Sequence, residues 1–264
     1  MDFEEFSKIF PVQSLNALLY PGSEVIGESI GEIFKGISHV SLDWLRRYNI
    51  VQQQKIDDFI DLASKKLEDI PVENRDNSKF GSVLKTIDDS KYQLDEDDMR
   101  KYFSNLIAAT LDNRKNEQVK PIFSEILKNL STEDANFLKL IYESDRFLPA
   151  SYIYKSKENE FIINNDLSDT GSSKRWTRSS NTYLLLEDYY LNNRNFEINV
   201  LEQLNLIQKI DKPASYPYSQ RYIQFEKYIK DTFPVLMPGY EYRTENFIYH
   251  LTNLGVLFCQ IVID

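Results

Sequence analysis

The sequence contains few of the residues that build metal centres and covalent cross-links. Its 264 residues include one cysteine, Cys259, and two histidines, His39 and His250. A single cysteine cannot form an intrachain disulfide, and three such residues fall short of the four ligands of a structural zinc site. Cys259 lies in an apolar run, which predicts a buried structural thiol. The sequence therefore predicts no bound metal.

Glycine and proline are also scarce, with eight and nine residues. These numbers are too low for a loop-rich barrel or a low-complexity chain. By contrast, 42% of the residues are apolar and 13% are aromatic, which allows a sizeable core and argues against general disorder. The composition favours a helix-rich globular fold.

Familiar catalytic motifs are missing as well. The chain has no G-x-x-x-x-G-K-[ST] loop, no G-x-G-x-x-G loop and no G-x-S-x-G turn. The first two motifs cradle phosphates, and the third presents a serine nucleophile. Their absence weighs against nucleotide hydrolysis of the familiar kinds and against serine-hydrolase chemistry. We expect no cofactor and favour a non-enzymatic protein.

Positive charge is in deficit, because 41 acidic residues outnumber 31 basic ones and the formal net charge is −10. An acidic surface repels phosphate, which disfavours nucleic acid and anionic membranes as partners unless the basic residues cluster. The first residues are acidic, unlike the basic start of a secretory signal, and no apolar stretch is long enough to span a membrane. We therefore expect a cytoplasmic protein.

Residues 23–48 carry the clearest helical pattern. A neighbouring stripe of glutamates makes this helix amphipathic. It is expected to pack on a protein partner or on a second copy of the chain, with peripheral membrane contact as the alternative. Six apolar residues recur at alternating steps of four and three and form one seam: Ile26, Ile30, Ile33, Ile37, Val40 and Trp44.

Further helices are predicted up to residue 130. The first covers 51–67, and a short one lies around 83–87. The acidic cluster at 95–98 lacks the ligand spacing of a calcium loop, and it is expected to begin a helix whose dipole it stabilises. Pro121 suits the first turn of the next helix. We therefore expect a mainly α protein with a helical domain over 1–130.

The sequence pattern over residues 131–264 predicts a second module. Ser131 is expected to cap its first helix, and residues 146–181 are expected to be an inserted loop. Helices are predicted at 182–191, 196–206 and 253–263, and strands at 206–210 and 247–251. This order favours a winged-helix-like α+β module with a small β-hairpin wing.

Three stretches share a pattern with one protein family: residues 99–110 (MRKYFSNLIAAT), 119–131 (VKPIFSEILKNLS) and 251–258 (LTNLGVLF). Together, over roughly residues 90–264, they resemble the Abi-alpha family, helical bacterial proteins associated with abortive infection. Two positions differ, because Lys120 replaces the customary histidine and Asn205 stands where glycine is usual. The resemblance implies a role in phage defence but no substrate, since the motif residues are expected to pack and cap.

Arg243 and His250 raise one enzymatic alternative, a ribonuclease of the HEPN class. Such enzymes place an arginine and a histidine four to six residues apart in a helical domain, and six residues separate this pair. The arginine would stabilise phosphate charge and the histidine would act as acid or base. However, both residues are predicted at the edge of a wing strand, which disfavours the alternative.

Nucleic-acid binding is the other alternative, because winged helices insert a helix into the major groove. The candidate recognition helix, 196–206, contains two glutamates and no basic residue. One compact basic-aromatic cluster exists, in which the indole could stack on a base: Lys174, Arg175, Trp176 and Arg178. We expect this cluster to be a solvated loop and the module to bind protein.

Overall fold

The computed structural model describes residues 34–36, 38–39, 42, 50–76, 78–157, 161–163, 172–186, 189–211 and 219–264. These residues form two compact units. One lies in the segment up to Ala135 together with Leu257–Asp264, and the other is Asn136–Val256. The apolar seam predicted over residues 23–48, and with it the membrane alternative, lies outside the described residues.

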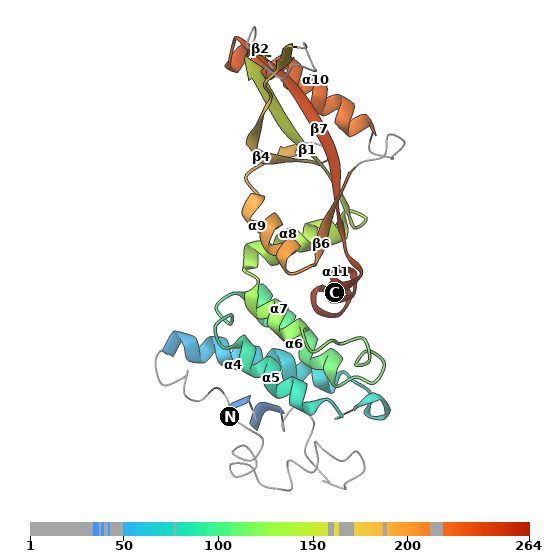
Figure 1. Cartoon of the computed structure of the whole chain (residues 1–264). Coiled ribbons are helices and arrows are strands. Elements are labelled where there is room, and N and C mark those ends of the chain that lie inside the picture. The colour runs from blue at the N-terminus through green and yellow to red at the C-terminus, as the bar shows by residue number, and fades with distance from the viewer. Residues whose placement is uncertain are drawn as a thin grey trace. The chain divides into compact units, whose positions relative to one another are not determined.

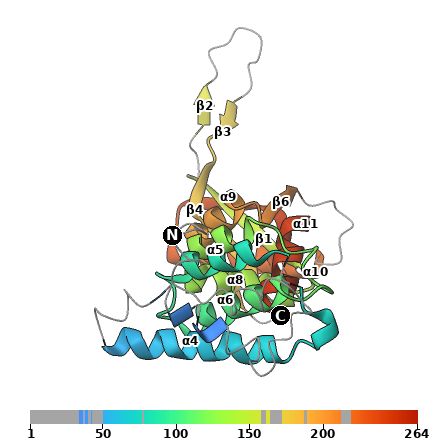
Figure 2. The same cartoon turned by 90° about the horizontal axis from the view of Figure 1, so that it is seen from below.

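Helices make up most of the first unit. They are α4 (Ile50–Glu68), α5 (Phe80–Ser90), α6 (Asp97–Thr110) and α7 (Phe123–Asn129). Helix α6 contacts α4, α5 and α7, and it lies between α4 and α5 (Figure 2). The helix predicted over 51–67 is confirmed, because its apolar face is buried in full: Ile56, Phe59, Ile60, Ala63 and Leu67.

The acidic cluster lies at the start of α6, where the sequence predicts a helix start. Asp97 and Asp98 belong to the first turn, and carboxylates there are stabilised by the helix dipole. Arg100 is ion-paired with Asp97 and donates to the Leu94 carbonyl. These contacts tie the beginning of α6 to the preceding turn.

The end of the chain completes the first unit. Helix α11 (Asn253–Phe258) continues into a π-helical turn, Cys259–Ile263. The Phe258 ring meets Phe123 of α7 edge to face at a centroid distance of 5.4 Å. The Asn105 amide donates to the Val262 carbonyl (2.8 Å), and Cys259 is buried, as expected for a structural thiol. Two of the stretches that carry the family resemblance therefore pack on each other through Phe123 and Phe258.

Helix α8 (Thr132–Glu143) begins with a reciprocal cap. The Asp134 N–H donates to Ser131 Oγ (3.1 Å), and the Ser131 N–H donates to the Asp134 carboxylate (2.9 Å). Two backbone donors that a helix start leaves unpaired are thereby satisfied. The cap predicted at Ser131 is present.

Ser131→Ala should lower the free energy of unfolding by about 1 kcal/mol, because the Asp134 N–H loses its acceptor. Urea-induced unfolding followed by circular dichroism would measure the loss. Ser180→Ala, at an exposed position, is the matched control and should stay within about 0.5 kcal/mol of the unmodified protein. Equal losses in the two variants would contradict the role of the cap.

The second unit is built on an antiparallel sheet of five strands in the order β5-β4-β1-β7-β6 (Figure 1). Its strands are β1 (Phe147–Lys157), β4 (Thr177–Leu185), β5 (Tyr190–Leu191), β6 (Ile207–Asp211) and β7 (Tyr240–Leu251). Short strands β2 (Phe161–Ile163) and β3 (Ser172–Lys174) pair as a separate sheet (Figure 2). Helices α9 (Asn195–Gln203) and α10 (Ser219–Leu236) also belong to this unit.

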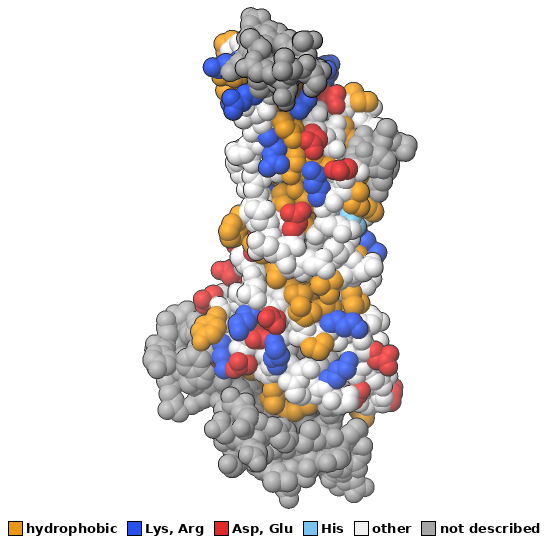
Figure 3. Space-filling model, in the orientation of Figure 1, with side chains coloured by type: hydrophobic (Ala, Val, Ile, Leu, Met, Phe, Trp, Pro, Cys, Tyr) orange, Lys and Arg blue, Asp and Glu red, His pale blue; other side chains and the backbone are white. Residues whose placement is uncertain are grey.

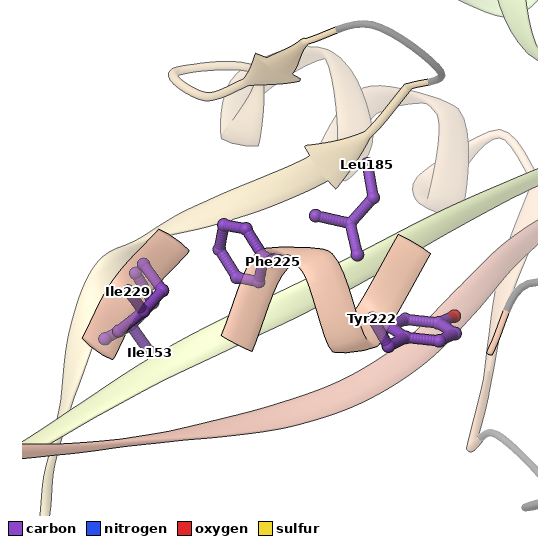
Figure 4. Close-up of a cluster of buried hydrophobic side chains, with 5 residues drawn as sticks. All are labelled: Ile153, Leu185, Tyr222, Phe225 and Ile229. Atoms are coloured by element: carbon purple, nitrogen blue, oxygen red, sulfur yellow. The ribbon is translucent and has the colours of Figure 1, made fainter. Parts of the chain in front are cut away.

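Helix α10 covers one face of the five-stranded sheet. A buried cluster joins the two (Figure 4): Ile153, Leu185, Tyr222, Phe225 and Ile229. The Tyr222 hydroxyl donates to the Phe247 carbonyl (2.7 Å), so this buried polar group is satisfied. Because Ile153 packs against α10, strand alternation turns Tyr152 and Tyr154 to the opposite face.

The predicted fold class, mainly α with a winged-helix-like module, is wrong, because the five-stranded sheet makes the protein α+β. The expected inserted loop, 146–181, contains β1 and the start of β4, and the expected helix, 182–191, completes β4 and adds β5. These strands bury apolar side chains on both faces, so they lack the simple alternation of a half-exposed strand. The predicted wing strands do pair as β6 and β7, but inside the larger sheet.

The segment after β7 packs on the turn that precedes β6. Thr252 Oγ1 donates to the Asn205 carbonyl (2.6 Å) and accepts from the Gly255 N–H (3.0 Å). Asn205 has a φ of 55°, a left-handed conformation in which asparagine is enriched. A Cβ on Gly255 would lie 2.0 Å from the Leu206 carbonyl oxygen. The backbone geometry of this junction therefore requires glycine at position 255.

Candidate functional site

Arg243 and His250, the pair considered as ribonuclease residues, share strand β7 but not one of its faces. Arg243 lies opposite Tyr154, and His250 lies opposite Phe147. Strands rise about 3.4 Å per residue and alternate their side chains, so these two residues project from opposite faces about 24 Å apart. The His250 ring stacks on Phe147, and its Nε2 lies 2.6 Å from Gln208 Nε2. The fold therefore does not place Arg243 and His250 in a common site.

The sheet face opposite α10 carries aromatic rings with cations above them. We name this surface the cation–aromatic face. Figure 3 shows it as a stripe of hydrophobic side chains over the sheet, bordered by Lys, Arg and acidic side chains. It comprises Tyr152, Tyr154, Trp176, Arg178, Lys209, Arg243 and Glu245.

One half of the cation–aromatic face is centred on Arg243. Its guanidinium carbon lies 4.9 Å from the centroid of the Tyr154 ring and 4.7 Å from that of Trp176. Arg243 is exposed, whereas the two rings are partly buried. The rings attract the guanidinium through their π electrons and hold its plane in place. The cation is thereby positioned while it still faces solvent.

The other half is centred on Tyr152. The Arg178 guanidinium lies 4.3 Å from the centroid of this ring, and Lys209 Nζ lies 4.6 Å from it. Lys209 Nζ is also 4.2 Å from the Phe247 ring. Strand pairing explains the gathering, because β4, β1, β7 and β6 are consecutive neighbours in the sheet. Residues from four separate segments of the chain therefore form one surface.

Glu245 is the one carboxylate among the seven residues of the cation–aromatic face. Its Oε1 lies 3.7 Å from Lys209 Nζ, and it accepts a hydrogen bond from the Tyr154 hydroxyl. That hydrogen bond raises the pKa of Tyr154 above its usual value, so the phenol stays neutral at physiological pH. Burial likewise raises the pKa of Tyr249, beneath the same face. Lys209 Nζ also lies 3.9 Å from Asp211, and strand alternation places Glu241 on the same side of β7 as Arg243, so carboxylates border the three cations.

The basic-aromatic cluster suggested by the sequence is divided by the fold. Trp176 and Arg178 belong to the cation–aromatic face, and Arg175, which precedes Trp176, is exposed. Lys174 lies in β3, where its backbone pairs with Phe161 in the small sheet. Lys209, Tyr152 and Tyr154 were not among the site residues expected from the sequence. The alternation of Tyr152, Tyr154 and Ser156 along β1 was the available signal.

The first unit contains a polar pocket of about 260 Å³ near the end of α6. Its charged lining residues are Lys66, Asp69, Asp112, Arg114, Lys115 and Asp264. Arg114 binds both carboxylate oxygens of Asp112 (2.8 and 2.6 Å), and these hydrogen bonds lower the pKa of Asp112. A general acid needs a raised pKa, so this ion-paired carboxylate is unsuited to that role.

Two further findings concern the described ranges alone. Among them, no group of three or more His, Cys, Asp or Glu side chains could hold a metal ion. No helix in the same ranges combines the length and apolar character needed to cross a bilayer.

Comparison with known proteins identifies a family. The family model described as "Abortive infection alpha" (Abi_alpha) matches residues 51–262 of the chain. No curated protein matches, and no solved structure does. The matched region includes every residue of the cation–aromatic face.

Proposed function

The chain belongs to the abortive infection alpha family, and from this we propose that it acts in defence against bacteriophage by binding a negatively charged partner on the cation–aromatic face. One observation carries the proposal. Three cations, Arg178, Lys209 and Arg243, are held over aromatic rings on a sheet face that α10 does not cover.

The cation–aromatic face gathers three cations in a protein that is acidic overall. The chain has a net charge of −10, so a random surface patch is expected to be acidic. Cations held over aromatic rings attract anionic groups such as phosphates and carboxylates. Holding Arg243 between Tyr154 and Trp176 also reduces the conformational entropy that it would lose on binding. Binding rather than turnover is favoured, because the three cations are positioned by aromatic rings and Glu245 is engaged with Lys209 and the Tyr154 hydroxyl.

Phage challenge tests the proposal. Bacteria that express the unmodified protein should form fewer plaques with at least one phage of a broad panel. Arg243→Glu combined with Lys209→Glu should return plaque numbers to those of cells without the protein, because both ends of the face then repel the partner. Protection that survives this charge reversal would refute the proposed surface.

Two control variants separate this effect from others. Lys227→Glu with Lys230→Glu makes the same charge change at exposed positions of α10, on the far side of the sheet, and should leave protection intact. His250→Ala should also leave protection intact, whereas the ribonuclease alternative requires its loss. Circular dichroism of each variant would verify that the fold is retained.

A further inference from the structure

We propose that the partner of the cation–aromatic face is a single-stranded nucleic acid, an inference that rests on the proposed function and names its ligand. Proteins that bind single strands combine cations that follow the phosphates with aromatic side chains on which bases stack. This face contains both kinds of group in alternation. Arg243 lies between Tyr154 and Trp176, and Arg178 and Lys209 lie over Tyr152.

The dimensions of the face suit a short single strand. Neighbouring strands lie about 4.8 Å apart, so the four strands from β4 to β6 span roughly 14 Å. Other four-stranded sheets with exposed aromatic residues stack about two or three bases. We assign Trp176 and the outer face of the Arg178 guanidinium to base stacking, because guanidinium planes also stack on bases. Lys209, with its compact charge, is assigned to a phosphate.

A duplex fits this unit less well. Base-edge recognition in duplex DNA needs an element that enters a groove. Helix α9 has no basic residue, and Glu197 lies in its first turn. An acidic peptide could pair with the guanidiniums, but its carboxylates would make no use of the partly exposed Trp176 ring. Single strands expose both their phosphates and the faces of their bases, so they alone use every group of the site.

The binding experiment uses the full chain and labelled twelve-nucleotide oligomers of deoxythymidine and of uridine, followed by fluorescence anisotropy. Binding should weaken with salt, with a slope of log K against log [salt] of about −2, since three cations each contribute about −0.7. Trp176→Ala should weaken binding about 5- to 150-fold, and Trp176→Phe should retain most of it. Arg243→Lys keeps the charge but loses the plane, so it should weaken binding without changing the slope.

Controls distinguish stacking from simple charge attraction. The chain has two tryptophans, so Trp44→Phe leaves Trp176 as the one indole reporter. Its fluorescence should be quenched by the oligomers and unaffected by poly-glutamate of equal charge. Glu245→Gln should tighten binding, and Lys227→Glu with Lys230→Glu should leave it unchanged. If neither oligomer binds, the inference is wrong. If poly-glutamate binds as tightly as the oligomers, the partner is an acidic protein and the inference is also wrong.

The two proposals fail separately. If the oligomers do not bind while the Arg243→Glu, Lys209→Glu chain has lost phage protection, the nucleic-acid inference is wrong and the proposed function stands. If the oligomers bind and that variant still protects, the face binds nucleic acid but the proposed function is wrong.

Discussion

Replacing Gly255 by alanine should destabilise the second unit by about 3 kcal/mol. The added methyl group would lie 2.0 Å from the carbonyl oxygen of Leu206, where backbone atoms cannot yield as the end of a side chain can. Insertion of a carbon into a packed site costs roughly 1–3 kcal/mol, and more where the neighbour is rigid. The shift would also strain the hydrogen bond from the Gly255 N–H to Thr252. Urea-induced unfolding followed by circular dichroism would measure the loss.

Gly81→Ala is the matched control for this prediction. Gly81 is an exposed residue of α5, and a Cβ there would have no atom within 4 Å. Alanine stabilises a helix by about 0.5–1 kcal/mol relative to glycine, so this variant should be as stable as the unmodified protein or more so. The glycine-to-alanine substitution would then lower the free energy of unfolding at position 255 but not at position 81. A stable Gly255→Ala variant would show that the junction between β6 and α11 is loosely packed.

Phe225→Ala should cost about 3–5 kcal/mol, the range for a large aromatic side chain removed from a core. Phe225 is fully buried between α10 and the sheet, and its ring contacts Tyr190 and Tyr183 at centroid distances of 4.9 and 5.5 Å. Removing the ring leaves a cavity and separates α10 from β4. Thermal unfolding together with urea titration would measure the loss.

Ile223→Ala, on the same helix, is the control for Phe225→Ala. Ile223 is 60% exposed, so its truncation should change stability by no more than about 0.5 kcal/mol. Similar losses at the two positions would mean that α10 does not pack on the sheet through Phe225. Phe225→Leu fills part of the cavity and should fall between the two alanine variants.

The helices of the first unit were predictable because their apolar residues repeat with the helical period and their starts carry capping signals. Ile56, Phe59, Ile60 and Ala63 share one face of α4, and Ser131 precedes α8. Helix α10 was not predicted, although Tyr222, Phe225 and Ile229 follow the same period. Pro234 within it and three more prolines nearby favoured a loop, whereas packing on the sheet stabilises the helix.

The sheet was harder to predict, because strand pairing depends on segments that are far apart in sequence. Tyr154 pairs with Arg178 and with Arg243, 24 and 89 positions away. Trp176 and Arg178 were identified from local composition, but nothing local connects them with Lys209. Arg243 was considered for its spacing to His250, a spacing that has no meaning on a strand because the two side chains face opposite ways.

The central position of β1 has a consequence for the synthesis of the protein. Along one edge β1 pairs with β7, which ends 94 residues after β1 in the sequence. Strand β1 therefore leaves the ribosome long before this partner strand has been synthesised. At usual elongation rates this interval lasts about 5–20 s. Throughout it, one edge of β1 presents unpaired N–H and C=O groups to other nascent chains. Truncated chains that end before Tyr240 lack β7, so this edge of β1 stays unpaired. We expect such chains to aggregate rather than accumulate as partly active fragments.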